Sequence, residues 1–345
     1  MSMKLKKRAE RFEQLGRQAR ETMAVTALHD LGIFEALRKG PRGAVELAAA
    51  VGAGPTKLRQ FLDAACVGGF LEKEPGAVPA EAVYRLVSGD EVLFDPEGPH
   101  VRTLGLSGWS RTFAAFSRVR EVLLKDEAFP SAGAGAAVSA DERRGFLMYL
   151  HARSLKAAGE VARILAREEY RAVLDLGSGA GTYAFALLRE SELAHATLVD
   201  HENAVPVILE CARSMGVGMD RFEVRAVDFF TEDYGRGFDL AILSNVLHVY
   251  EPHRSKALLR ALRGRMSPGG RVVVKELVVD EQRIGPETGV WFGVTMALFG
   301  QGGDAYSEKE LVEWIEEAGF GHEITYGLRE APESQLIVAR VPRDG

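Results

Sequence analysis

Residues 172–181 read AVLDLGSGAG, an apolar strand that runs directly into three glycines spaced as GxGxG. Glycines at this place allow a tight turn and let the backbone approach a ligand closely. Dinucleotide sites carry GxGxxG instead, and their third glycine lets a helix pack beside a bound diphosphate. Here Gly181 comes one residue early, and Asp175 brings a carboxylate near the place of a phosphate. The stretch therefore predicts a strand–turn–helix unit for a ligand without a phosphate.

Acidic residues follow the next two apolar strands. Asp200 ends HATLVD (195–200), in the region where a Rossmann-fold acid accepts ribose hydroxyls. Asp228 and Phe229 follow the third strand, where an acid can accept the adenine amino group and a ring can stack on the base. A helix-capping Asp200, and a turn Asp228 beside a core Phe229, are the structural alternatives. These features fit S-adenosylmethionine, which has a ribose, an adenine and a positively charged amino-acid end but no phosphate.

Strands alternate with helices from residue 171 onward, which predicts an α/β fold with a doubly wound, parallel, Rossmann-like sheet. The carboxyl ends of such strands meet at one edge, where ligands bind. The predicted strands begin with 172–181 and continue with 195–200, 222–230, 238–248, 271–280 and an edge strand at 334–341, and the predicted helices are 182–190, 203–215, 252–265 and 307–318.

The fourth predicted strand ends in SNVLH (244–248), which brings His248 to the binding edge. Histidine is the natural general base for a hydroxyl proton near neutral pH. Glu276, at the end of the fifth strand, would orient the imidazole. A structural histidine and a surface or capping glutamate are the alternatives. No spacing of His, Cys, Asp or Glu predicts a metal site.

The first hundred residues predict helices and a hairpin. The stretch 44–72 reads as helix, glycine-rich turn and helix, and VYRLV (83–87) reads as a strand, which together form a winged-helix pattern. DNA binding would need basic residues on the second helix, where only Lys57 and Arg59 are found. Packing between two copies of the chain is the other interpretation.

The overall composition excludes several classes of protein. The net charge of −6 argues against a nucleic-acid partner. Apolar stretches fall short of the roughly 20 residues that span a bilayer, and the charged N-terminus is unlike a signal peptide. Cys66 and Cys211 read as two reduced thiols. A cytoplasmic protein without a membrane partner is expected.

Taken together, these motifs resemble the two-domain small-molecule O-methyltransferases, which include plant caffeate-type enzymes, acetylserotonin methyltransferase and bacterial natural-product enzymes. The resemblance implies a winged-helix dimerisation domain over 1–100, a helical connector over 101–160 that contributes to the pocket, and a catalytic domain over 161–345. A homodimer is expected. The matching segments are LGIFEAL (31–37), AVELAAAVG (44–52), LRQFLDAACVGGFLE (58–72), VLDLGSGAG, TLVD, VDFF, SNVLH, MSPGGRVVVKE (266–276) and GGDAYSEKELVEWIEEAGF (302–320).

The resemblance also implies roles for single residues. His248 is the implied base and Glu276 its acid. Ala305 stands where the family often has a second glutamate, so the adjacent Asp304 is the candidate replacement, and Val249-Tyr250 stands in place of Asp-Trp. Catalysis mainly by proximity is the alternative. The expected cofactor contacts are Asp175, Gly177, Ser178, Gly179, Gly181, Asp200, Asp228, Phe229, Ser244 and Asn245.

The stretch GVWFGVTMALFG (289–300) carries aromatic residues and methionine at near-helical spacing. In the family this segment helps line the acceptor pocket, whereas a core or dimer helix is the alternative. A small, flat, hydroxylated acceptor and release of S-adenosylhomocysteine are therefore expected. Methylation of nitrogen or carbon, non-methyl chemistry such as decarboxylation, and a regulator that senses the cofactor remain open. The expected pocket residues are Tyr149, Trp291, Phe292, Met296 and Phe299.

Overall fold

The computed structural model describes residues 3–95, 109–125 and 140–343. The chain forms two compact units, residues 1–117 and 118–345. Each unit has its own hydrophobic core. The described residues of the predicted connector, 101–160, are divided between the two units, and 101–108 and 126–139 lie outside the described residues.

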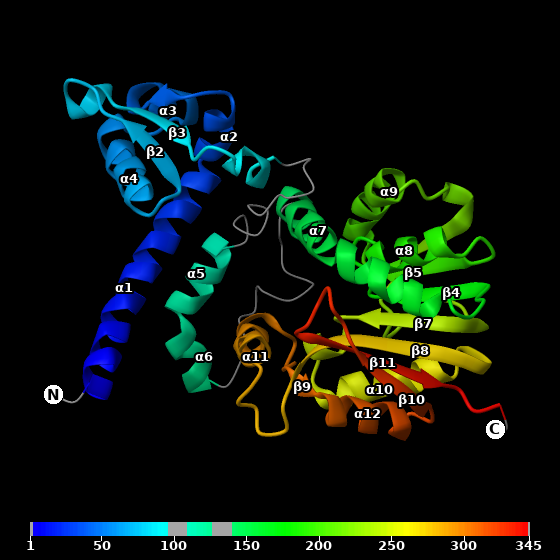
Figure 1. Cartoon of the computed structure of the whole chain (residues 1–345). Coiled ribbons are helices and arrows are strands. Elements are labelled where there is room, and N and C mark those ends of the chain that lie inside the picture. The colour runs from blue at the N-terminus through cyan, green and yellow to red at the C-terminus, as the bar shows by residue number, and fades with distance from the viewer. Residues whose placement is uncertain (1–2, 96–108, 126–139, 344–345) are drawn as a thin grey trace. The chain divides into compact units, whose positions relative to one another are not determined.

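The first unit contains the predicted winged helix (Figure 1). Glu46 begins one helix by accepting a hydrogen bond from the backbone N–H of Gly43, and Pro55 begins the next. Three short antiparallel strands in the order β1-β3-β2 form the wing. The elements are α1 (Met3–Asp30), α2 (Ile33–Arg38), β1 (Arg42–Gly43), α3 (Ala44–Val51), α4 (Pro55–Val67), β2 (Leu71–Glu74), β3 (Val83–Leu86) and α5 (Trp109–Ser117).

The second unit is built on a mixed sheet in the order β10-β11-β8-β7-β4-β5-β6, with β9 beside β8. The five strands from β4 to β8 are parallel, as expected. The sheet departs from the predicted parallel arrangement only at its end, where β11 is antiparallel to β8 and to β10. The strands are β4 (Ala172–Leu176), β5 (His195–Asp200), β6 (Phe222–Ala226), β7 (Phe238–Ser244), β8 (Met266–Val279), β9 (Tyr306–Ser307), β10 (Gly321–Gly327) and β11 (Ser334–Arg340).

The strand predicted at 334–341 was expected at the sheet edge, and this was wrong. It pairs on both sides, and β10 forms the edge instead. Most of β10 is exposed, so its sequence GHEITYG lacks the alternation of apolar and polar residues that would indicate a half-buried strand. By contrast, the buried β11 has the continuous apolar run that its interior position requires.

Helices cover both faces of this sheet (Figure 1). Residues of α7, α8 and α9 pack in one core cluster, and those of α10 and α12 pack in the other. Helix α8 is buried from Thr182 to Leu188. Among the described residues, no helix has the length and apolar character needed to cross a bilayer. The helices are α6 (Val119–Lys125), α7 (Ala140–Leu165), α8 (Thr182–Glu190), α9 (Val205–Ser214), α10 (Pro252–Arg263), α11 (Glu287–Phe299) and α12 (Glu308–Glu317).

Candidate active site

The glycine loop connects β4 to α8 at the carboxyl edge of the sheet. Gly177, Gly179 and Gly181 all have positive φ angles, of 70°, 57° and 74°. Side chains are strained in this conformation, so glycine is required. Space is also limiting, because a β-carbon on Gly177 would lie 2.9 Å from a methyl group of Val246. The loop therefore presents bare backbone at the predicted binding edge.

Asp200, at the end of β5, holds this loop. Its Oδ2 accepts a hydrogen bond of 2.7 Å from the backbone N–H of Gly179, and its Oδ1 accepts one of 2.8 Å from the N–H of His201. Burial raises the pKa of the Asp200 carboxyl group, whereas these hydrogen bonds oppose the rise. The structure thus brings the predicted ribose-binding acid into direct contact with the glycine loop.

Asp175 lies beneath the loop with only 2% of its surface exposed. Its Oδ2 accepts a hydrogen bond of 3.2 Å from the backbone N–H of Ala184, in the first turn of α8. Burial raises the pKa of Asp175 to about 7, and the charge of Asp200 adds to the effect. In a dinucleotide site, a backbone N–H in this first helical turn would face a phosphate. Here the carboxyl group of Asp175 accepts its hydrogen bond instead.

Two hydroxyl groups near the loop provide a test of the expected ligand. The Oγ atom of Ser178, in the loop, is buried and has no hydrogen-bond partner among the described residues, and the buried Oγ of Ser244, at the end of β7, has only the hydroxyl of Tyr183 near it. Buried polar atoms are normally satisfied, so unpartnered ones indicate a place for a ligand or water. The glycine cradle and these hydroxyls fit the polar amino-acid end of S-adenosylmethionine.

Asp228 and Phe229 follow β6, and the structure gives both of them local contacts. Asp228 accepts hydrogen bonds from the backbone N–H of Phe230 at 2.9 Å and from the hydroxyl of Thr231 at 3.2 Å. Phe229 is 9% exposed, and its ring packs edge-on to Tyr250. Their predicted contacts with adenine stay a prediction, and both residues also serve the turn itself.

His248 and Glu276 form a buried pair. The Nδ1 atom of His248 lies 2.5 Å from Oε2 of Glu276, and the two residues are 6% and 1% exposed. Oε1 of Glu276 accepts two further hydrogen bonds, of 2.9 and 2.8 Å, from the backbone N–H groups of Val246 and Leu247. Both carboxylate oxygens are therefore used to hold the turn and its imidazole. Such a carboxylate fixes one tautomer, in which Nδ1 carries the proton and Nε2 is the basic atom.

The strand boundaries at this pair differ from the prediction. β7 ends at Ser244, and His248 lies in the single turn η6 (Leu247–Val249) rather than on a strand. β8 continues past Glu276 to Val279. The register still brings the two together, because Ser244 at the end of β7 pairs with Lys275.

The strand ends at Asn245 because this residue adopts a left-handed conformation, with φ 60°. Its backbone N–H donates a hydrogen bond of 2.8 Å to the carbonyl oxygen of Lys275. Its side-chain Oδ1 accepts one of 3.3 Å from the Lys275 ammonium group. Asn245, predicted as a cofactor contact, thus has its amide oxygen bound to a lysine. Sequence reasoning missed Lys275, although a charged residue inside the apolar run VVVKELVV was a usable signal.

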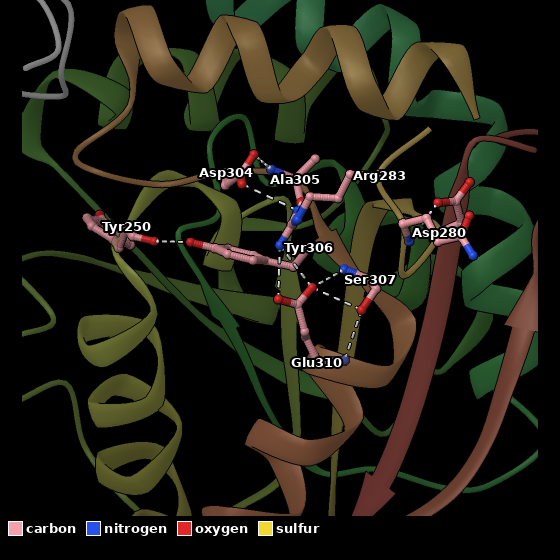
Figure 2. A network of polar contacts seen from close by, with 9 residues as sticks. Tyr250, Asp280, Arg283, Asp304, Ala305, Tyr306, Ser307 and Glu310 are labelled. Atoms are coloured by element: carbon pink, nitrogen blue, oxygen red, sulfur yellow. Dashed lines mark hydrogen bonds and ion pairs between the residues drawn. The ribbon is translucent and has the colours of Figure 1, made fainter. Parts of the chain in front are cut away.

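The Asp304 carboxylate has Ala305 and Arg283 as its described partners, and no contact with the imidazole is found among the described residues (Figure 2). The Asp304 carboxylate accepts a hydrogen bond of 2.7 Å from the backbone N–H of Ala305 and lies 3.3 Å from Arg283. Arg283 also donates to the carbonyl oxygen of Ala305 and, at 2.9 Å, to Glu310. Arg283 therefore holds the segment 302–306 in place. No sequence pattern predicted this role, because its partners are distant in the chain.

Among the predicted pocket residues, Phe292 on α11 contacts the pair. Its ring stands edge-on to the His248 imidazole with 4.7 Å between the ring centres. Trp291 is 60% exposed, and Met296 and Phe299 are half-buried on the same helix. Tyr149, on α7, accepts a hydrogen bond from Arg153. Only Phe292 in this set has a described contact with the candidate catalytic residues.

Comparison with known proteins places the chain in a family. The sequence profile of the O-methyltransferase domain matches residues 127–321, and that of the O-methyltransferase dimerisation domain matches residues 14–88. A 3-hydroxy-5-methyl-1-naphthoate 3-O-methyltransferase of Streptomyces sahachiroi is 27% identical, over 87% of this chain and 86% of that one. The tetracenomycin polyketide synthesis 8-O-methyl transferase TcmO of Streptomyces glaucescens is 28% identical over 93% of both chains.

A solved structure supports the architecture. The human N-acetylserotonin methyltransferase, solved in complex with SAM, superposes with a TM-score of 0.78 over 96% of this chain and 97% of that one. The two are 22% identical, so this likeness shows the fold. The profile match to the catalytic domain covers more than half of the sequence. The chain therefore belongs to the two-domain O-methyltransferase family, whose methyl donor is S-adenosylmethionine.

Proposed function

We propose that this enzyme methylates a hydroxyl group of a small aromatic or polycyclic acceptor, with His248 as general base. The observation that carries the proposal is the 2.5 Å contact between His248 Nδ1 and Glu276 Oε2. Two relatives named for a naphthoate and for tetracenomycin support an aromatic acceptor. The exposed Trp291 and the half-buried Phe292 on α11 would provide a flat apolar surface beside the base.

The base acts through the atom that Glu276 leaves free. Glu276 accepts the Nδ1 proton of His248, so Nε2 has the lone pair that takes the proton from the acceptor hydroxyl. The carboxylate then stabilises the imidazolium that forms, as an orienting acid does in other base–acid pairs. When bound, S-adenosylmethionine supplies the activated methyl group, and S-adenosylhomocysteine is the product. The acceptor oxygen gains the methyl as it loses its proton to His248.

The proposed cofactor site is the edge around the glycine loop. The positive φ angles of the loop expose backbone groups, and Asp200 at its side would accept the ribose hydroxyls. The buried hydroxyls of Ser178 and Ser244 would bind the amino-acid end. The complete proposed set is Asp175, Gly177, Ser178, Gly179, Gly181, Asp200, Asp228, Phe229, Ser244 and Asn245, and the proposed acceptor pocket consists of Tyr149, Trp291, Phe292, Met296 and Phe299.

We also propose that the enzyme works as a homodimer in the cytoplasm. The match of residues 14–88 to a dimerisation domain supports the homodimer. The two cysteines, Cys66 and Cys211, are both free thiols, which suits a reducing compartment. Sedimentation of the full chain would measure its mass in solution, and a monomer at micromolar concentration would contradict the dimer.

The test of the proposed base compares two histidines. His248→Ala removes the buried imidazole, and His253→Ala removes a nearby imidazole that is exposed and paired with Glu251. Both variants are titrated with S-adenosylhomocysteine by calorimetry and assayed for methyl transfer to a hydroxynaphthoate. We expect His248→Ala to keep its affinity for S-adenosylhomocysteine and to lose roughly 10²- to 10³-fold in kcat, with His253→Ala unchanged. Full activity of His248→Ala would reject the base and leave catalysis by proximity.

A further inference from the structure

Lys275 is a buried lysine next to the candidate active site. It lies on β8 directly before Glu276, and only 6% of its surface is exposed. Its ammonium group donates a hydrogen bond of 3.3 Å to Oδ1 of Asn245. Lysine is almost never fully buried unless it is paired, so its position in a central strand requires an explanation. None of the proposed catalytic steps uses it.

Asn245 is the partner, and its backbone is unusual. Asn245 and Arg283 are the non-glycine residues with positive φ in the described part of the chain. Residues with a β-carbon disfavour this conformation, although asparagine tolerates it better than most. Lys275 contacts Asn245 twice, because its carbonyl oxygen also accepts a hydrogen bond of 2.8 Å from the Asn245 N–H. The lysine thus holds both the main chain and the side chain of this residue.

The left-handed turn at Asn245 directs the next three residues toward Glu276. The backbone N–H groups of Val246 and Leu247 point to Oε1 of Glu276, and the imidazole of His248 reaches Oε2. Successive residues of a strand point to opposite faces of the sheet. Lys275 and Glu276 therefore hold the same turn from the two faces of β8.

We propose that Lys275 is a positioning residue, which keeps Asn245 in its left-handed conformation and so sets the His248 imidazole in its reactive orientation. The inference rests on the proposed role of His248 as base. Lys275 does not touch the reacting atoms, so its loss changes the catalytic step and leaves cofactor binding intact. Glycine adopts positive φ freely, so a glycine at position 245 removes the need for the lysine.

The experiment is a double-mutant cycle with Lys275→Met, Asn245→Gly and the two combined. Methionine keeps the length of the lysine stem and removes the ammonium group. We expect Lys275→Met to lower kcat about tenfold, because a small misplacement of a reacting group is costly. In the Asn245→Gly background the same substitution changes kcat by less than about threefold. Lys275→Met changes the Kd for S-adenosylhomocysteine by less than about threefold, both in the original chain and in the Asn245→Gly background.

Lys256→Met is the control, because Lys256 lies in the same unit, is half-buried and pairs with a single carboxylate, Glu317. It leaves kcat unchanged. Thermal unfolding of every variant separates a loss of orientation from a loss of folded protein. If Lys275→Met does not fold, the double variant is compared with Asn245→Gly alone. A kcat within about threefold of the Asn245→Gly value supports the inference.

Losses in kcat that multiply in the double variant overturn the inference, because they mean that Lys275 acts independently of Asn245. An unchanged kcat in Lys275→Met overturns it as well. A failure of the base itself is distinguishable, since it is seen in His248→Ala, which contains an intact Lys275. A raised Kd for S-adenosylhomocysteine with unchanged kcat would assign Lys275 to cofactor binding and would also reject the positioning role.

Discussion

The α-carbon of Gly303 packs directly against the carbonyl oxygen of His248, with no room for a side chain between them. Backbone pairing continues beside this contact, where Gln301 donates to the carbonyl oxygen of Val249 at 2.7 Å and accepts from the N–H of Glu251 at 3.2 Å. The segment 301–306 therefore supports the turn that carries the candidate base.

Gly303→Ala should displace that turn. The added methyl group would overlap the His248 carbonyl, so one of the two segments must move. We expect kcat to fall at least tenfold, because orientation of the base is sensitive to small shifts. Steady-state kinetics with a hydroxynaphthoate measures the change. Gly264→Ala is the control, since its nearest neighbour to a β-carbon is 3.6 Å away, and equal activity of both variants would contradict the role of the contact.

Glu276→Gln should disturb the imidazole more than the fold. Glutamine has one carbonyl oxygen and one amide nitrogen, whereas Glu276 accepts from two backbone N–H groups and from His248. If its oxygen stays on the backbone, its NH₂ group faces Nδ1 and favours the wrong tautomer. We expect kcat to fall by about 10²-fold with little change in the Kd for S-adenosylhomocysteine. A variant with normal kcat would show that the carboxylate does not orient the base.

Arg283→Met should loosen the segment 302–306. The guanidinium group contacts Ala305, Asp304 and Glu310, and it is partly exposed. We expect a loss of about 1 kcal/mol in the free energy of unfolding, together with a several-fold lower kcat. Urea unfolding followed by tryptophan fluorescence measures the first quantity. Lys309→Met breaks an exposed pair with Glu281 in the neighbouring turn and should change neither quantity.

Asp175 should make stability depend on pH. Its pKa is raised to about 7 by burial, against about 4 in an unfolded chain. Between these values the folded protein binds one more proton than the unfolded chain, so this group lowers stability as pH rises from about 4 to 7. Asp175→Asn removes that dependence.

The free energy of unfolding of Asp175→Asn, relative to the original chain, should therefore rise with pH over this window. The shift corresponds to an upper limit of a few kcal/mol, at about 1.4 kcal/mol per pKa unit. Urea unfolding at pH 5 and pH 7.5, without cofactor, gives the difference. A constant difference between the two proteins at both pH values would mean that Asp175 ionises normally.

Asp200→Asn and Asp228→Asn should separate binding from local structure. Asp200 holds the glycine loop and is the proposed acceptor for the ribose, so its variant should bind S-adenosylhomocysteine at least tenfold more weakly. Both oxygens of Asp228 already accept hydrogen bonds within its own turn. Its variant should lose stability, with a smaller effect on affinity. Calorimetry decides, and a stronger effect at Asp228 would assign adenine recognition to this carboxylate.

The spacing of apolar runs and glycines was enough to predict the core of the fold. Helix α8 was predicted at 182–190, and it has these bounds, because its start is fixed by the glycine loop. β10 was not predicted, since an exposed edge strand needs no apolar pattern. The antiparallel pairing of β11 depends on the connection through β10. The sequence of β11 itself does not indicate this direction.

The placement of the candidate residues was predictable where they lie near the carboxyl ends of parallel strands. Asp200, His248 and Glu276 are brought to one edge by the parallel register. Contacts between segments distant in sequence were not predictable in the same way. Asp304 is one residue from the position that the family uses, but Arg283 and the Ala305 N–H hold its carboxylate. The direction of a side chain after a turn depends on such partners, and the spacing of residues in the sequence does not predict which partners these are.

Helix α8 has no solvent-facing side over its first seven residues. The glycine loop is covalently continuous with this helix and is hydrogen-bonded to β5. Opening the loop would therefore expose core residues, at a free-energy cost close to that of unfolding the sheet. The loop is preorganised, because its shape exists before any ligand binds. Binding therefore does not include the entropic cost of ordering the loop.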